Sequence, residues 1–182
     1  TLETVTWAAG LLASTKRITV FATVHAPLFN PLIAAKEFVT ADHIGRGRFG
    51  LNIVCGWNED EFRMFNVEQR EHDLRYEHAQ EWVDILKKVW SQKEPFDFDG
   101  QYVKVKEAIG DPKPYGGSRP IIMNAGSSPV GRAYAIRNCD ALFTSPVHGS
   151  IEKTAEKVQA AKHEAAAHGN DLDVYTIGLV FC

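Results

Sequence analysis

The stretch FGLNIVCGWNEDEF, residues 49–62, begins as a buried strand and then changes character within a few positions. Its first six residues are mostly aromatic, β-branched or leucine, a composition that favours a strand. Asn52 interrupts this apolar run, and three consecutive acidic residues follow at 59–61. A buried amide must hydrogen-bond through both its donor and its acceptor. Asn52 is therefore either a tie to neighbouring backbone or a ligand-binding group at the end of a strand.

Strand and helix patterns alternate on both sides of this stretch. The sequence predicts helices at 2–17, 30–48, 72–92, 127–139 and 150–169, and strands at 17–24, 49–54, 119–126, 140–146 and 174–181, with a loop from 55 to about 71. Asp99-Gly100 lies between two alternating runs, which predicts a hairpin over 95–108. We also expect Asp73 to cap the helix at 72–92.

Two of these helices carry apolar residues at helical spacing. The predicted buried stripe of the helix at 30–48 is Leu32, Ile33, the Lys36 stem, Val39 and Ile44, and that of the helix at 72–92 is Leu74, His78, Trp82, Ile85, Leu86 and Val89. Pro31 suits a first helical position, and Gly45 and Gly47 suit a helix end. Both helices are therefore expected to pack one face against a sheet.

Repeated strand–helix units predict an α/β fold with a parallel sheet. Five strands fit either a doubly wound sheet of flavodoxin type or part of an eight-stranded barrel, which five strands alone do not close. The chain begins at Thr1 within a predicted helix and ends at Cys182 within a predicted strand. We interpret residues 1–182 as a single domain that is truncated or incompletely represented at both ends.

The composition and net charge of the chain bear on whether it binds nucleic acid or membranes. The chain of 182 residues has a net charge of −3 and a pI near 6.1, so no basic field attracts nucleic acid or an anionic membrane. Its three cysteines form no CxxC pair, which predicts reduced thiols and a cytoplasmic protein. We therefore expect neither nucleic-acid nor membrane partners. A small-molecule ligand is the partner to look for.

Sites in parallel α/β folds form at the carboxyl ends of the strands, so the residues after each strand are the candidates. They are His25 and Asn30; Asn52, Cys55, Trp57, Glu59, Asp60 and Glu61; His72, Arg75 and Tyr76; the segment 124–129; and Ser145 with His148. The histidines match no metal-ligand spacing, so we expect no metal site. Cys55 is expected to be a packed thiol, and no dinucleotide or P-loop glycine motif is present in the sequence.

The segment NAGSSPVGRA, residues 124–133, predicts a phosphate site. Gly126 allows a tight turn, Ser128 suits the N-cap of a helix, and Pro129 suits its first position. Free backbone N–H groups and the helix dipole would then favour an anion, to which the Ser127 and Ser128 hydroxyls can donate. The alternative is a plain capped turn without a ligand.

The order and spacing of several motifs resemble a known family. ADHIGRGRFGLNIVCGW, HDLRYEHA, FDFDGQYVKV and IIMNAGSSPVGRAYA are similar to the bacterial-luciferase-like flavin monooxygenases, in the branch with alkanesulfonate, dimethyl sulfone and pyrimidine monooxygenases. The resemblance covers nearly the whole chain. It implies a (β/α)8 TIM barrel, of which the five strands here correspond to the third through seventh.

The resemblance also implies a cofactor and residue roles. Asn52 would contact the ring of FMN, and Arg75, Tyr76 and Ser128, beside Ser127, would reach toward its phosphate. Glu61 would line the same site, as in the pyrimidine branch, and the loop from Cys55 to Gln69 would help cover the substrate. His25 is the candidate catalytic residue, because it lies at a strand end facing the flavin in this alignment.

The implied activity is that of a two-component oxidoreductase. Reduced FMN (FMNH2) from a separate NAD(P)H-dependent flavin reductase reacts with O2 to form a C4a-(hydro)peroxyflavin, which oxygenates a small sulfonate, sulfone or pyrimidine-like substrate. The aromatic residues Trp57, Phe62 and Phe65 would exclude water. We also expect a homo-oligomer. Two alternatives stay open: a deazaflavin-dependent hydride-transfer enzyme of the same superfamily, and a non-catalytic or vestigial barrel fragment.

Overall fold

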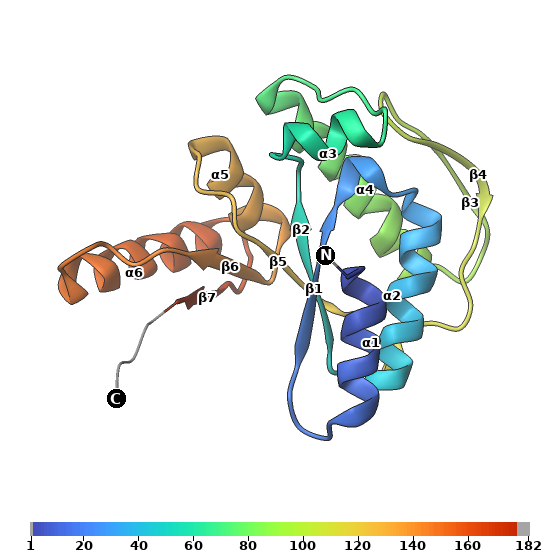
Figure 1. Ribbon diagram of the computed structural model, residues 1–182, viewed down its shortest axis with the longest axis horizontal. Coiled ribbons are helices and arrows are strands. Elements are labelled where there is room, and N and C mark those ends of the chain that lie inside the picture. The colour runs from blue at the N-terminus through green and yellow to red at the C-terminus, as the bar shows by residue number, and fades with distance from the viewer. Residues whose placement is uncertain (1, 178–182) are drawn as a thin grey trace. The chain divides into compact units, whose positions relative to one another are not determined.

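The computed structural model describes residues 2–177 and divides into two compact units, Thr1–Pro120 and Ile121–Cys182 (Figure 1). Both units are built from strands and helices that alternate along the chain. The α/β class predicted from the sequence is therefore confirmed. Each unit is described in turn.

Two parallel strands form the centre of the first unit. β1 (Val20–His25) and β2 (Phe49–Val54) pair along their whole length, from Val20 opposite Phe49 to His25 opposite Val54. α1 (Thr4–Ser14) precedes β1, the short helix η1 (Ala26–Leu28) follows it, and α2 (Pro31–Gly45) connects the two strands. α1 and α2 run side by side (Figure 1). The parallel register brings the carboxyl ends of both strands to the same edge.

α2 buries a different face from the one predicted. The Asn30 side chain caps it by accepting from the N–H groups of Leu32 and Ile33, and it ends at Arg46 in the left-handed conformation. The predicted stripe is confirmed at Val39, which is 6% exposed, and is wrong at Ile33 and Ile44, which are 57% and 42% exposed. The buried face carries mainly small residues instead: Pro31, Ala34, Ala35, Phe38, Val39, Ala41, Asp42 and Gly45. Small side chains let the helix backbone approach its neighbours closely.

The segment predicted as a loop before residue 71 contains a helix, α3 (Glu59–Met64). Glu59, Asp60 and Glu61 form its first turn, where negative charge is favoured by the helix dipole. α4 (His72–Ser91) follows, with Glu71 at its N-cap. The prediction that Asp73 caps α4 is wrong, because Asp73 lies in the first turn, with its carboxylate 2.8 Å from the His72 ring nitrogen.

Aromatic side chains from α2, β2 and α4 fill the core of the first unit. Phe38 stacks against Phe49 at 5.7 Å between ring centroids and meets Trp82 and Trp90 edge-on at 6.2 and 6.4 Å. The predicted stripe of α4 is largely confirmed, since Trp82, Ile85, Leu86 and Val89 are buried. Leu74 was also predicted to be buried, but it is 38% exposed.

The predicted hairpin is confirmed. β3 (Phe96–Asp99) pairs antiparallel with β4 (Lys104–Ala108), and residues 100–103 form the turn. The segment after β4 passes through a short helix, η2 (Tyr115–Gly117).

The described part of the second unit, residues 121–177, contains three parallel strands and two helices. β5 (Ile121–Asn124) pairs with β6 (Ala141–Thr144), which pairs with β7 (Asp173–Thr176). α5 (Pro129–Asn138) and α6 (Ile151–Ala167) connect them. The core consists of Ala135, Ile136, Leu142, Ala161, Ala165 and Leu172. The last strand was predicted at 174–181, of which residues 178–181 lie outside the described residues.

A buried carboxyl group ties α2 to two later segments. Asp42 is 1% exposed and accepts from the N–H of Tyr115 at 2.9 Å and from the N–H of Phe49. Burial, the largest influence, raises the pKa of this carboxyl.

We expect Asp42→Ala to lower the free energy of unfolding by about 2 kcal/mol, because it leaves the backbone N–H groups of Phe49 and Tyr115 without their acceptor. Asp42→Asn keeps an acceptor oxygen and should cost less than half as much. Urea unfolding of the full chain measures both, with Asp171→Ala as the control at an exposed aspartate. Equal losses for Asp42→Ala and Asp171→Ala would contradict this role.

Candidate flavin-binding site

The polar groups at the carboxyl ends of β1 and β2 begin with Asn52. Its Nδ2 donates to the Thr23 hydroxyl at 3.1 Å, across the parallel pair in which these two residues face each other. Its Oδ1 is buried and has no hydrogen-bond partner among the described residues. Turning the amide by 180° exchanges the two atoms but still leaves one of them without a partner. The strand end therefore presents one unused hydrogen-bonding atom.

His25 and Glu61 meet beside it. The Nδ1 of His25, at the end of β1, lies 3.4 Å from Oε2 of Glu61 in α3. The contact is within ion-pair distance, but Nδ1 makes no hydrogen bond of acceptable geometry. Burial lowers the pKa of His25, and the Glu61 carboxylate opposes this shift without cancelling it. The neutral imidazole is therefore the favoured form near pH 7.

The segment from Cys55 to α4 forms a wall next to these groups. Gly56 has a φ of 96°, and a Cβ there would collide with the ring of Phe62, which is 2% exposed. Cys55 is buried, as expected for a packed thiol. Trp57 and Phe65 are 73% and 58% exposed, so of the three aromatic residues expected to exclude water only Phe62 is buried.

Arg75 and Tyr76 occupy the first turns of α4. The Arg75 guanidinium donates to the carbonyl of Arg70 at 2.6 Å and to that of Gly56 at 2.8 Å. Arg75 thus holds together the two ends of the segment that carries α3. Tyr76 is half-buried, and its ring meets the His72 ring edge-on at 5.4 Å.

Ser127 and Ser128 belong to the second unit. Ser128 caps α5 as predicted, with its Oγ accepting from the N–H of Gly131 at 3.1 Å, so its hydroxyl hydrogen is available to another acceptor. A Cβ at Gly126 would lie 2.7 Å from the Cα of Gly131, which explains why glycine is needed there. Ser127 is exposed and lines a cavity of about 70 Å³ with Arg132 and Lys157.

The structure brings His25, Asn52, Glu61 and Arg75 to one end of the first unit. Asn30, another strand-end candidate, is a helix cap and does not belong to this group. Within residues 2–177, no cluster of three or more histidine, cysteine or acidic side chains is arranged to hold a metal ion.

Sequence reasoning missed two contributors to this end of the unit. Thr23 is exposed in an apolar strand, and only the register of β1 against β2 identifies it as the partner of Asn52. Arg70 accepts from Arg75 through its carbonyl, a contact for which side-chain type gives no signal.

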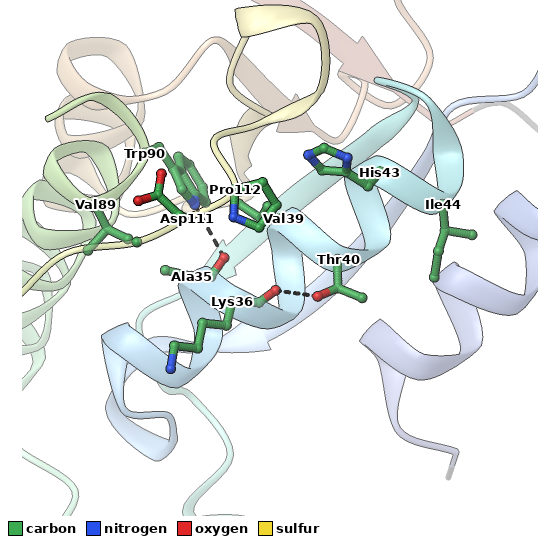
Figure 2. Close-up of a pocket in the computed structure, with 11 residues that line it drawn as sticks. Ala35, Lys36, Val39, Thr40, His43, Ile44, Val89, Trp90, Asp111 and Pro112 are labelled. Carbon is green, nitrogen blue, oxygen red and sulfur yellow. Dashed lines mark hydrogen bonds between the residues drawn. The ribbon is translucent and has the colours of Figure 1, made fainter. Parts of the chain in front are cut away.

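A larger cavity of about 560 Å³ lies elsewhere in the first unit, between α2, α4 and the segment 110–112 (Figure 2). Its lining includes Val39, Val89, Trp90 and Pro112 beside His43. None of the strand-end candidates contributes to it, so it is separate from the site at β1 and β2. Among the helices of residues 2–177, none combines the length and the apolar character needed to span a membrane.

Comparison with known proteins identifies the family. The model of the family described as luciferase-like monooxygenase matches residues 1–182, and the chain belongs to this family. The FMNH2-dependent dimethylsulfone monooxygenase of Pseudomonas putida is 34% identical over 172 residues, which are 94% of this chain and 47% of that protein. The pyrimidine monooxygenase RutA of Acinetobacter baylyi is 31% identical over 185 residues, 98% of this chain and 48% of that protein. The chain thus spans about half the length of these relatives.

Solved structures show the same fold. Riboflavin lyase RcaE, crystallised with modified FMN and riboflavin, superposes with a TM-score of 0.85 at 27% identity, over 96% of this chain and 44% of that one. An F420-dependent secondary alcohol dehydrogenase superposes with a TM-score of 0.74 at 22% identity, over 94% of this chain and 52% of that one. The second likeness shows the fold alone.

The lowered pKa of His25 gives a pH prediction. Below its ordinary value of 6.5 the unfolded chain takes up a proton at His25 that the folded chain resists, so folding loses stability as pH falls. We expect the native protein to lose free energy of unfolding between pH 7 and pH 5 through His25, and the His25→Asn variant to lack this loss. The stability of the variant relative to the native protein should therefore rise as pH is lowered from 7 to 5. Urea unfolding across this range measures the difference, with His148→Asn as the exposed control. A difference that is constant with pH would contradict the prediction.

Proposed function

We propose that this protein is a flavin-dependent monooxygenase that uses reduced FMN supplied by a separate NAD(P)H-dependent flavin reductase, together with O2 and a small organic substrate. The substrate classes we propose are sulfonates, sulfones and pyrimidine-like rings. Of the two relatives described above, one is named an FMNH2-dependent dimethylsulfone monooxygenase and the other a pyrimidine monooxygenase, which supports the class of activity.

The unused polar atom of Asn52 carries the proposal. A buried amide atom without a partner costs about 1–3 kcal/mol, so a strand end that keeps one implies a partner outside the described chain. The pyrimidine edge of a flavin offers both an N–H donor and carbonyl acceptors, and therefore satisfies this amide in either orientation. The polar groups at this strand end therefore fit FMN. Asn52 would bind the flavin ring, and Glu61 would line the part of the site that holds the ring.

The phosphate of FMN would be bound by Arg75, Tyr76, Ser127 and Ser128. Arg75 donates through Nε and one terminal nitrogen to carbonyls, which leaves guanidinium hydrogens for a phosphate oxygen. The Ser128 hydroxyl keeps its hydrogen while it caps α5, and the helix dipole favours the anion.

When bound, reduced FMN supplies the electrons that activate O2 for transfer of one oxygen atom to the substrate. His25 is the candidate catalytic residue, because it lies at the end of β1 with its Nδ1 3.4 Å from Glu61, and its neutral imidazole can accept a proton. Glu61 would stabilise the resulting imidazolium. Phe62, buried beneath Gly56, would keep water from the wall of the site.

The finer architecture is part of the proposal. We propose that residues 1–182 are part of a single domain of the (β/α)8 TIM-barrel type. The family match along the whole chain and the likeness to RcaE support this. We also propose a cytoplasmic homo-oligomer; the compartment is inferred from the three cysteines of the sequence, which form no CxxC pair.

Equilibrium titration of the full chain tests the cofactor. We expect reduced FMN to bind more tightly than oxidised FMN, as the use of FMN as a transferred co-substrate requires. The reduced deazaflavin F420 serves as the comparison ligand under the same anaerobic conditions. Binding of F420 in preference to either form of FMN would favour the hydride-transfer alternative, and binding of no flavin would favour a non-catalytic fragment.

Paired variants separate the two ends of the cofactor. We expect Asn52→Ala to weaken FMN and riboflavin alike, by about tenfold, because both contain the same ring system. The double variant Tyr76→Phe with Ser128→Ala should weaken FMN by ten- to hundredfold, on the order of a charge-assisted pair of hydrogen bonds, and riboflavin much less. Fluorescence titration with both flavins measures this. Equal losses in the double variant would show that its residues do not bind the phosphate.

A further inference from the structure

The β3–β4 hairpin is fastened to α4 by one carboxylate. Glu81 accepts the backbone N–H groups of Gln101, Tyr102 and Val103 at 2.8, 2.8 and 3.0 Å, so three consecutive donors of the turn converge on it. A carboxylate that accepts several backbone N–H groups forms charge-assisted bonds, which fix the turn firmly. The position of Tyr102 is therefore set by α4 and not by the turn alone.

Tyr102 is held on three sides. Its hydroxyl donates to Glu77 at 2.7 Å, and this bond is the main reason that the pKa of the phenol is raised. Its ring stacks on His78 with 5.6 Å between centroids. On the ring also lies the guanidinium of Arg70, whose Cζ is 5.0 Å from the ring centroid. Arg70 lies outside the hairpin, in the segment that precedes α4.

Arg70 connects this fixed ring to the candidate site. Its carbonyl accepts from Nε of Arg75 at 2.6 Å, and Arg75 in turn donates to the carbonyl of Gly56 at 2.8 Å. Gln69 adds a second, longer contact to the same Gly56 carbonyl at 3.4 Å. A continuous series of contacts therefore runs from the hairpin turn through Tyr102, Arg70 and Arg75 to the end of β2.

We infer that Tyr102 and Arg70 are positioning residues for the phosphate end of the cofactor site: the hairpin turn fixes the Arg70 backbone, and this backbone orients the Arg75 guanidinium. The inference rests on the proposed function, because it assigns Arg75 to the phosphate. It gives the hairpin, which lies outside the strand–helix repeat, a role in the site.

The contact between Arg70 and Tyr102 is strong enough, relative to the packing of the segment 55–71, to influence the position of that segment. The segment 55–71 contains only a short helix, and Trp57, Met64 and Phe65 are more than half exposed, so its own packing stabilises it weakly. A cation–π contact is strong enough to change the population of a weakly packed segment several-fold. An arginine that is held in place before the ligand arrives loses less side-chain entropy on binding.

The test uses Arg70→Met and Tyr102→Leu in the full chain, and the chain contains its own matched control. Lys88 of α4 lies over the ring of Phe96 in the same hairpin at 5.5 Å, a second cation–π contact that is not part of the series leading to Arg75. We expect Arg70→Met and Tyr102→Leu to weaken FMN by five- to tenfold and riboflavin by less than twofold. Lys88→Met should change neither, and Arg70→Lys should restore most of the FMN affinity.

Hydrogen exchange supplies a readout that does not need a flavin. Amides in residues 56–71 should exchange faster in Arg70→Met and Tyr102→Leu than in the native chain, while Lys88→Met leaves them unchanged. If neither variant alters exchange there, or if both flavins are weakened equally, the inference is overturned. If the native chain binds no flavin, the proposed function fails, and the exchange result alone decides whether the hairpin positions the segment.

Arg70→Met should leave the hairpin folded, because it does not affect the hydrogen bonds from the turn to Glu81. An effect of this variant on FMN binding therefore does not come from unfolding of the hairpin. In an Arg75→Met background, Arg70→Met should cause no further loss of FMN affinity, since its effect passes through Arg75. A full additional loss in that background would show that Arg70 acts independently of Arg75.

Discussion

The parallel pairing of β1 with β2 is the constraint on which the site depends. Its register sets Thr23 opposite Asn52 and ends both strands at the same edge, with His25 opposite Val54. A shift by one residue would turn Asn52 toward the opposite face of the strand and remove its partner, because side chains alternate along a strand. The apolar alternation of both strands, buried at Ala22, Val24, Leu51 and Ile53, makes such a shift costly. Core packing therefore also determines the chemistry at the strand ends.

Arg75 illustrates how one side chain can hold a segment in place and still have donors left over. Its guanidinium joins the two ends of a segment whose own core is small, and it keeps hydrogens for a ligand. A guanidinium has five N–H donors in fixed directions, whereas a lysine ammonium has three on a single atom, which suits it less well to bridging two carbonyls.

Much of the fold was predictable because its signals are local. The strand at 49–54, the hairpin around Asp99-Gly100 and the Ser128 cap depend on residues within a few positions of one another. The predictions that failed depended on a competing effect. Ile33 and Ile44 match helical spacing, yet α2 buries its alanine face, because close approach of backbones outweighs the hydrophobicity of two larger side chains. The short helix α3 was hidden by its acidic composition, which is favourable only at a helix start.

By itself, the sequence determined the order of strands and helices and the residue types available where each strand ends, because periodicity and turn chemistry are written along the chain. The order and spacing of its motifs also indicated the family, which the match along residues 1–182 confirms. Only the tertiary structure decided that Asn52 has one satisfied and one unused polar atom, that His25 meets Glu61, and that Tyr102 reaches Arg70. These contacts join residues on different elements, and their geometry follows from strand register and helix packing, which no local pattern encodes.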